Sequence, residues 1–170
     1  MTSARRGEVK LRMNAPADKI WATLADVERM GEWSPECYRV RWVGGARSPA
    51  TKGARFKGYN RWQRWLRWTM SCEVMTADPG RELSWSTVRG GKEIVRWTYR
   101  LQPANGATEV TESFEAKSWP LDVRLFEDYV MRNRNEGRKQ AMRTTLERIK
   151  AVVEAGRPSS DLDFLRVRSP

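Results

Sequence analysis

Alternation of polar and apolar residues predicts that most of this chain is β-structure. In residues 8–13 every second residue is apolar, so Val9, Leu11 and Met13 share one face of a half-buried strand. The same period of two returns in residues 38–43, 53–62, 65–76, 83–89, 93–101 and 108–116. Turn residues separate these runs, Asn105-Gly106 among them, which predicts seven antiparallel strands joined largely by hairpins.

Helical periodicity appears at two places. After the first strand, Pro16 begins a short helix over about 16–27 with Ile20 and Leu24 on one face, and a second short helix extends to about Met30. Near the C-terminus a long helix is predicted over about 120–155, ended by the Gly156–Ser160 segment. Its apolar stripe includes Phe126, Val130, Ala141, Thr145, Ile149 and Val152.

This order of elements predicts a single domain of the α+β class. The long helix must bury its stripe, and the antiparallel sheet offers one apolar face to receive it. A chain of 170 residues has room for one such domain, which we expect over residues 1–156. Residues 157–170 are expected to form a short, mobile tail.

Composition removes several kinds of chemistry. The sequence contains no histidine, which excludes Ser-His-Asp and Cys-His catalytic arrangements and histidine-ligated zinc. The two cysteines, Cys37 and Cys72, lie far apart in the sequence and fit no metal-binding spacing, so small buried side chains are the simpler interpretation. We expect neither a metal nor a cofactor.

The sequence contains no apolar run of the length that a membrane span needs, about 18 residues. The basic N-terminus is followed by a charged strand rather than by the apolar stretch of a signal peptide. We therefore expect a cytoplasmic protein without a transmembrane segment. The sequence leaves open whether it is a monomer or a homodimer.

Several segments, in order, resemble the START-like or SRPBCC superfamily, and within it the polyketide cyclase/dehydrase type. The segments that carry the resemblance are Ala15–Trp21, Leu24–Arg29, Glu32–Glu36, Gly53–Gly58, Trp97–Leu101 and Thr108–Glu112. The similarity spans about residues 8–155 and implies a helix-grip fold, in which a curved seven-stranded sheet wraps around the C-terminal helix. Members of the superfamily include cyclases, lipid carriers, hydrolases and binding proteins, so no catalytic residue is carried over from it.

A curved sheet closed by a helix leaves space for a ligand, and the inward rows of the strands supply its walls. Tyr38, Val40 and Trp42 are expected to form one such inward row. The predicted apolar wall consists of Trp42, Phe56, Trp68, Met70, Trp85, Trp97, Tyr99, Phe114, Phe126 and Val130. Many aromatic rings favour a flat or aromatic ligand, although the same residues are also typical of ordinary core packing.

Polar residues on these apolar rows are candidates for ligand contacts. Asn60, Thr87 and Glu112 fall on inward positions of strands, and Asn133 and Gly137 fall on the stripe of the long helix. A buried polar group costs free energy unless it has a partner, so these residues are either satisfied within the fold or face a cavity. Gly137 would allow a close approach of the helix to the sheet or to a ligand.

Burial should raise the pKa of Glu112 and make it a candidate acid or base. Tyr99 and Asn60 are the other catalytic candidates. The segment Trp33-Ser34-Pro35 is expected at the mouth of the cavity, with Glu32 and Glu36 in solvent.

A net charge of +11 attracts anions, and part of it is concentrated in one predicted hairpin. Arg55, Lys57, Arg61, Arg64 and Arg67 lie there without an intervening acid, and two tryptophans interleave with them. Such a surface suits RNA or an anionic membrane, whereas a charge that only keeps the protein in solution is the simpler alternative.

Three functions remain open. The first is a binding or carrier protein for a hydrophobic or aromatic molecule, such as a lipid or a polyketide. The second is a cyclase- or dehydratase-type enzyme that uses neither histidine nor a metal. The third is a basic interaction protein.

Overall fold

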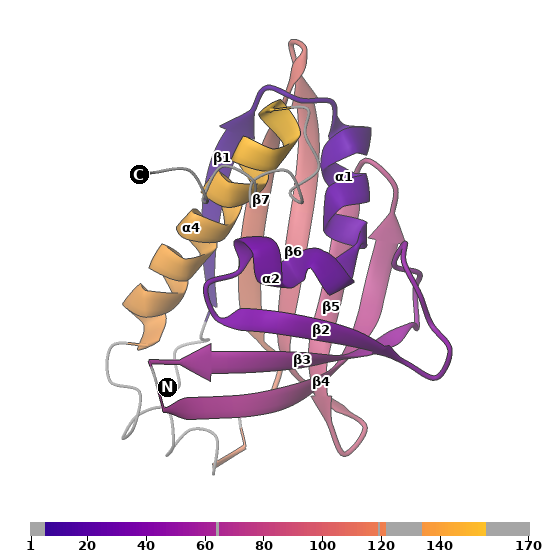
Figure 1. Cartoon of the computed structure of the whole chain (residues 1–170), viewed down its shortest axis with the longest axis vertical. Coiled ribbons are helices and arrows are strands. Elements are labelled where there is room, and N and C mark those ends of the chain that lie inside the picture. The colour runs from indigo at the N-terminus through magenta and orange to yellow at the C-terminus, as the bar shows by residue number, and fades with distance from the viewer. Residues whose placement is uncertain (1–5, 64, 119, 122–133, 156–170) are drawn as a thin grey trace, which may run out of the picture.

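A computed structural model describes residues 6–63, 65–118, 120–121 and 134–155. Within these residues seven strands form one antiparallel sheet in the order β1-β7-β6-β5-β4-β3-β2 (Figure 1). The strands are β1 (Arg6–Met13), β2 (Cys37–Val43), β3 (Arg55–Trp62), β4 (Leu66–Asp78), β5 (Glu82–Arg89), β6 (Lys92–Ala104) and β7 (Ala107–Ala116). The seven antiparallel strands predicted from the alternation are confirmed, with bounds that differ by a few residues.

Hairpins connect the strands from β3 to β7 in sequence, whereas β1 pairs with β7, the last strand of the chain. Two of these hairpins, β5–β6 and β6–β7, close with two-residue turns, which are Gly90-Gly91 and Asn105-Gly106. Asn105 and Gly106 both have positive φ angles, 48° and 75°, as a type I′ turn requires. The Asn-Gly pair therefore fixes the register that places Tyr99 opposite Glu112.

The predicted inward row of the first hairpin strand is wrong at one residue. A register shift between Cys37 and Arg39 inserts an extra residue into β2 opposite β3. Because of this bulge, Cys37 and Val40 are both buried, and Tyr38 is 38% exposed on the outer face. Strict alternation cannot detect a bulge, because one inserted residue exchanges the two faces of the strand.

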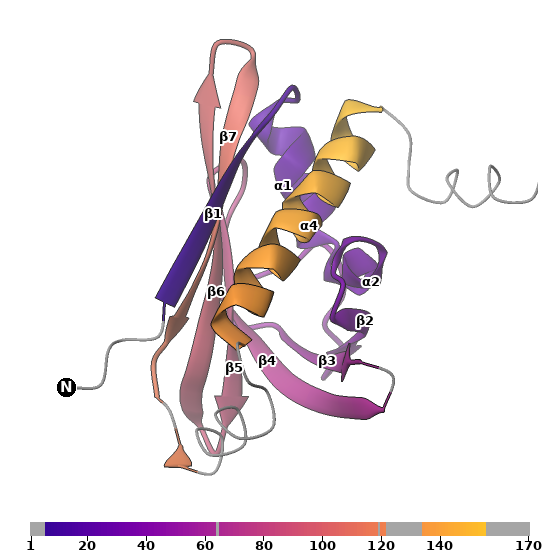
Figure 2. The same ribbon diagram turned by 90° about the vertical axis from the view of Figure 1, so that its left-hand side faces the viewer.

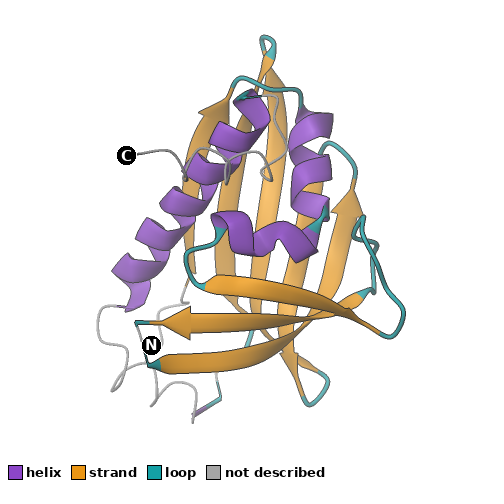
Figure 3. Ribbon diagram, in the orientation of Figure 1, coloured by secondary structure: helices purple, strands orange, loops and turns teal. Residues whose placement is uncertain are grey.

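Among the described residues, three helices and a short 3-10 turn lie over the concave face of the sheet (Figures 2 and 3). They are α1 (Ala17–Ala25), the 3-10 turn η1 (Val27–Arg29), α2 (Met30–Trp33) and α4 (Arg134–Glu154). The two short helices after the first strand are confirmed. Only the C-terminal part of the predicted long helix lies within the described residues.

The helix α4 packs mainly against β1 and also contacts α2, α1 and β7, while α2 packs against β2 at the opposite edge of the sheet. The buried side chains of α4 include Met142, Leu146, Ile149 and Val153, which recur every three or four residues. The curved sheet and its C-terminal helix are those of the expected helix-grip fold. The helix α1 packs against the central strands β5 and β6. Because α2 and α4 rest on opposite edges of the sheet, an internal space can remain between them over the central strands.

Candidate functional site

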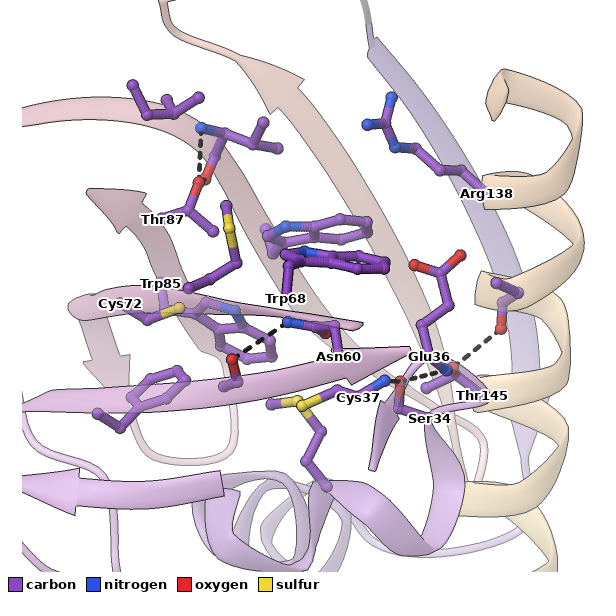
Figure 4. Close-up of a pocket in the computed structure, with 18 of the residues that line it drawn as sticks. Ser34, Glu36, Cys37, Asn60, Trp68, Cys72, Trp85, Thr87, Arg138 and Thr145 are labelled. Atoms are coloured by element: carbon purple, nitrogen blue, oxygen red, sulfur yellow. Dashed lines mark hydrogen bonds between the residues drawn. The ribbon is translucent and has the colours of Figure 1, made fainter. Parts of the chain in front are cut away.

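A cavity of about 750 Å³ lies between the central strands, the α2–β2 connection and α4 (Figure 4). Nine of the residues predicted for a ligand site line it: Phe56, Asn60, Trp68, Met70, Trp85, Thr87, Trp97, Tyr99 and Glu112. A volume of this size is within the range of small-molecule sites in proteins. The inward rows of β3 to β7 therefore converge on one space.

Gly58 on β3 helps to keep this space open. It lies on the inward row between Phe56 and Asn60, and it lines the cavity. A Cβ atom built on Gly58 would have Cys37 Sγ at 3.6 Å and Asn60 Nδ2 at 3.8 Å as its nearest neighbours. These are ordinary contact distances, so the missing side chain leaves room rather than relieving a clash.

Aromatic rings form a continuous series along the cavity wall. Phe56 contacts Trp85 edge to face, with ring centroids 6.1 Å apart, and Trp85 stacks on Tyr99 at 5.5 Å with an interplanar angle of 29°. Such contacts add stability beyond the buried area and hold the rings in fixed orientations. The wall therefore presents flat apolar surfaces in a fixed arrangement.

One carboxyl group lies within this aromatic wall. Glu112 on β7 is 3% exposed, and the Tyr99 hydroxyl donates a hydrogen bond of 2.7 Å to its Oε1 atom. Its Oε2 atom has no hydrogen-bond partner among the described residues. Burial raises the pKa of Glu112 from its ordinary 4.5 to about 8, although the bond from Tyr99 opposes the rise. The carboxyl group is therefore mostly protonated at neutral pH.

Other polar groups of the cavity have partners within the fold. The Thr87 hydroxyl accepts a hydrogen bond of 3.1 Å from the backbone of Val95, next to a register shift between β5 and β6. The Thr145 hydroxyl donates to the carbonyl of Ala141 in the preceding helical turn. Asn60 Nδ2 donates to the carbonyl of Gly58 at 3.2 Å. By contrast, Oε2 of Glu112 is a buried oxygen without a hydrogen-bond partner among the described residues.

Burial also sets the state of the two cysteines. Both thiols are free and buried in the cavity wall. Loss of water raises the pKa of Cys37 to about 12 and raises that of Cys72 as well. The expectation of small buried side chains is met, and neither thiol ionises near neutral pH.

Several lining residues were not predicted as part of the site. Glu36 was expected in solvent, but it is half-buried and lines the cavity together with Ser34 and Met30. Arg138 is 5% exposed, and its guanidinium lies 5.3 Å from the ring centroid of Phe114. Arg138 precedes Met142 by four residues, so the stripe of α4 already contained the signal for it.

Three predicted residues do not line the cavity. Trp42 packs edge to face on Phe56 and donates its ring N–H to Ser48, so it lies outside the wall. Phe114 packs between Trp97 and Arg138. Gly137 is exposed and borders a shallower pocket. The expected close approach at Gly137 is not seen, because a Cβ atom there would meet no described atom within 4 Å.

The remaining three predicted residues, Phe126, Val130 and Asn133, lie outside the described residues. In the part that the structure describes, no cluster of cysteine and acidic residues could hold a metal ion. No described helix combines the length and the apolar character needed to cross a bilayer.

The predicted basic hairpin presents its charges on the outer face of the sheet, away from the cavity. Arg55, Lys57, Arg61 and Arg67 are exposed there, and Arg64 lies outside the described residues. Arg55 forms an ion pair with Glu73 at 2.9 Å. Arg61 and Arg67 are opposite each other on β3 and β4, and both guanidinium groups lie within about 6 Å of the Tyr38 ring.

Comparison of the sequence with protein families gives one match. Residues 5–154 match a family described as polyketide cyclase / dehydrase and lipid transport. No curated protein sequence matches the chain significantly.

Solved structures with the same fold come from several kinds of organism. A polyketide-cyclase-like protein from Corynebacterium glutamicum is 28% identical, with a TM-score of 0.50 over 91% of this chain and 88% of that one. Ginseng major latex-like protein 151 has a TM-score of 0.66 at 9% identity, over 88% and 97% of the two chains. A di-domain ARO/CYC protein from the steffimycin biosynthetic pathway has a TM-score of 0.65 at 13% identity. The match covers 89% of this chain and 51% of that protein.

Proposed function

Since the chain belongs to the polyketide cyclase / dehydrase and lipid transport family, we propose that it binds or carries a hydrophobic or aromatic small molecule between its sheet and α4. The observation that carries this proposal is the cavity of about 750 Å³ walled by tryptophan, phenylalanine and tyrosine rings. Burial of apolar ligand surface against such a wall supplies the binding free energy, and stacking on fixed rings favours flat molecules.

Binding is tested by titrating the protein with N-phenyl-1-naphthylamine, a neutral aromatic dye, and by native mass spectrometry of gently purified protein. We expect saturable binding of one dye per chain, and a bound mass that is lost after extraction with organic solvent. A dye that binds no more tightly to the native protein than to the urea-unfolded chain, together with a ligand-free mass, would contradict the proposal.

A cyclase- or dehydratase-type enzyme is the second candidate, and the Tyr99–Glu112 pair favours it. A protonated carboxyl group beside a phenol, within an enclosed apolar site, suits proton transfer to a carbonyl group of a bound chain. Holding a flexible substrate in one shape would supply much of the rate enhancement. Turnover that survives unchanged in both Glu112→Gln and Tyr99→Phe would exclude this role.

An anionic membrane surface is the partner that we propose for the outer face of β2, β3 and β4. Arg61 and Arg67 lie directly opposite each other on β3 and β4, and none of the described acidic residues lies between them. The two positive charges repel each other, and a bound anion would offset this repulsion. Trp65, 66% exposed in the β3–β4 connection, is placed to enter the interfacial layer of a bilayer. Tyr38 and Tyr59 already stack with arginine, which reduces the ring surface left for RNA bases.

A further inference from the structure

Glu112 and Tyr99 occupy matching positions on neighbouring strands. They face each other across β6 and β7, and both line the cavity. The phenol donates to Oε1 of the carboxyl group at 2.7 Å, so the lone pairs of that oxygen are partly used. The second oxygen, Oε2, is buried without a partner among the described residues. A buried oxygen in this state has unused hydrogen-bonding capacity, which destabilises the site until a partner uses it.

The chemistry that would use this capacity depends on the proton of the carboxyl group. Apolar surroundings disfavour the ionised form, and burial outweighs the opposing hydrogen bond from Tyr99 in raising the pKa of Glu112. The titratable groups that line the same cavity are Tyr99 on β6, Cys37 on β2, Cys72 on β4, Arg89 on β5, Arg138 on α4 and Glu36 before β2. The protonated form carries one O–H donor, and a neutral acceptor can use it without placing a charge in the cavity.

We propose that the Glu112–Tyr99 pair is a hydrogen-bond-donating subsite that holds a carbonyl oxygen of an aromatic ketone or quinone against the cavity wall. Tyr99 fixes the orientation of the carboxyl group, and the acid proton is donated to the ligand. The stacked rings of Trp85 and Tyr99 supply the flat surface beside this donor. The subsite rests on the proposed ligand cavity and adds the chemical class of the ligand to it.

Three probes of similar size test whether the subsite prefers a carbonyl oxygen, an apolar group or a cation. They are 2-acetylanthracene, 2-isopropenylanthracene and 2-(aminomethyl)anthracene. The first two differ only in a carbonyl oxygen or a methylene group, and the third carries a cation. Affinities are measured by quenching of tryptophan fluorescence at neutral pH. Because one hydrogen bond to a buried donor is gained, we expect the ketone to bind about tenfold more tightly than the hydrocarbon.

The variants distinguish donation by the carboxyl group from a mere loss of packing. Glu112→Gln keeps an N–H donor of similar shape and should keep the preference for the ketone. Glu112→Leu would free the Tyr99 hydroxyl to donate, so the double variant Glu112→Leu/Tyr99→Phe, which has no donor at either position, should bind ketone and hydrocarbon equally. Glu109→Gln is the matched control on the same strand, since Glu109 faces outward, and it should behave as wild type. Thermal melting of each variant verifies folding, and Glu112→Met/Tyr99→Phe, which also has no hydrogen-bond donor, replaces the double variant if that one does not fold.

Each contrary result has its own meaning. Equal binding of ketone and hydrocarbon to the wild-type protein would overturn the subsite and leave the cavity proposal intact. Preferential binding of the amine would overturn it in favour of an ionised carboxylate that binds cations. If none of the three probes binds, the proposed ligand cavity fails and the subsite fails with it.

Discussion

At the scale of single residues, Glu112 combines burial, a hydrogen bond and a raised pKa in the wall of the cavity. Its carboxyl group is surrounded by apolar wall residues and is hydrogen-bonded to Tyr99. Burial raises its pKa to about 8, and the same burial raises the pKa of Tyr99 further above its ordinary value. The pair therefore stays neutral under conditions in which an exposed glutamate carries a charge.

This neutrality makes stability depend on pH in a definite direction. Below about pH 4.5 Glu112 is protonated in both the folded and the unfolded chain, so the stability that its raised pKa contributes is then fully present. Between about pH 4.5 and 8 the unfolded chain releases the proton and the folded protein keeps it. The contribution of this group to the free energy of unfolding is therefore lost progressively as pH rises through that window.

The Glu112→Gln variant has no carboxyl group at this position, so its free energy of unfolding should not show this fall with rising pH. We expect the free energy of unfolding of the wild type, relative to Glu112→Gln, to fall by about 2 kcal/mol or more between pH 5 and pH 8. Urea denaturation at several pH values measures the difference. Glu109→Gln serves as the exposed control, and a pH-independent difference between wild type and Glu112→Gln would show that the folded pKa is not raised.

At the scale of elements, β3 combines two roles because its side chains alternate between the faces of the sheet. On the cavity side of β3 lie Phe56, Gly58 and Asn60, and on its outer side lie Arg55, Lys57, Tyr59 and Arg61. This one strand therefore contributes residues to both proposed sites. Gly58 weakens the strand intrinsically, since glycine has no side chain to pack and loses more entropy on folding. The presence of Gly58 on the inward row is explained if a ligand occupies the space that the missing side chain leaves open.

A larger residue at Gly58 should therefore weaken ligand binding and leave the fold equally stable or more stable. In Gly58→Val the new side chain would extend into the cavity, while its Cβ meets only ordinary contacts. We expect the affinity for N-phenyl-1-naphthylamine to fall about tenfold or more, and the free energy of unfolding to stay equal or rise by up to about 1 kcal/mol. Lys57→Val, one position along on the outer face, should leave dye binding unchanged. Equal dye affinity in Gly58→Val and wild type would mean that the dye binds elsewhere.

At the scale of the whole molecule, two faces of one sheet carry different chemistry. The helices α1, α2 and α4 lie on the concave face of the sheet (Figure 1). That face encloses the apolar cavity, and the outer face of β2 to β4 carries arginines and tyrosines in contact with one another. A net charge of +11 attracts the chain to anionic surfaces in general. The arginine pair on β3 and β4 and the exposed Trp65 would add a preferred orientation to that attraction.

Vesicle binding tests this arrangement. The wild-type protein should bind vesicles that contain phosphatidylserine, bind pure phosphatidylcholine vesicles weakly, and lose affinity as salt rises. The double variant Arg61→Gln/Arg67→Gln should lose about tenfold or more in affinity, at about 1 kcal/mol per charge. Arg81→Gln/Lys92→Gln removes the same charge at exposed positions elsewhere and should lose less. Equal losses of vesicle affinity in the two double variants would mean that only the net charge matters and not the position of the arginines. Tight binding to single-stranded RNA, without binding to vesicles, would identify RNA as the partner instead.

Much of the fold follows from local pattern. A period of two places alternate side chains on opposite faces, so the inward rows of β3 to β7 could be predicted residue by residue, from Phe56 to Glu112. The Asn105-Gly106 turn also fixes a register, and with it the Tyr99–Glu112 pair. Where the chain departs from regular alternation, as at the β2 bulge beside Tyr38, the pattern gives the wrong face.

The sequence by itself determined which side chains point inward, because strand geometry is local. Only the tertiary structure decided which of them line the cavity, because that depends on where the helices rest on the sheet. Trp42 and Trp85 are both predicted to point inward, yet Trp42 packs behind Phe56 whereas Trp85 faces the space. Glu36 and Arg138 join the wall from segments that the strand pattern does not relate to one another. Proximity between distant segments is set by packing of the whole domain, and no local period encodes it.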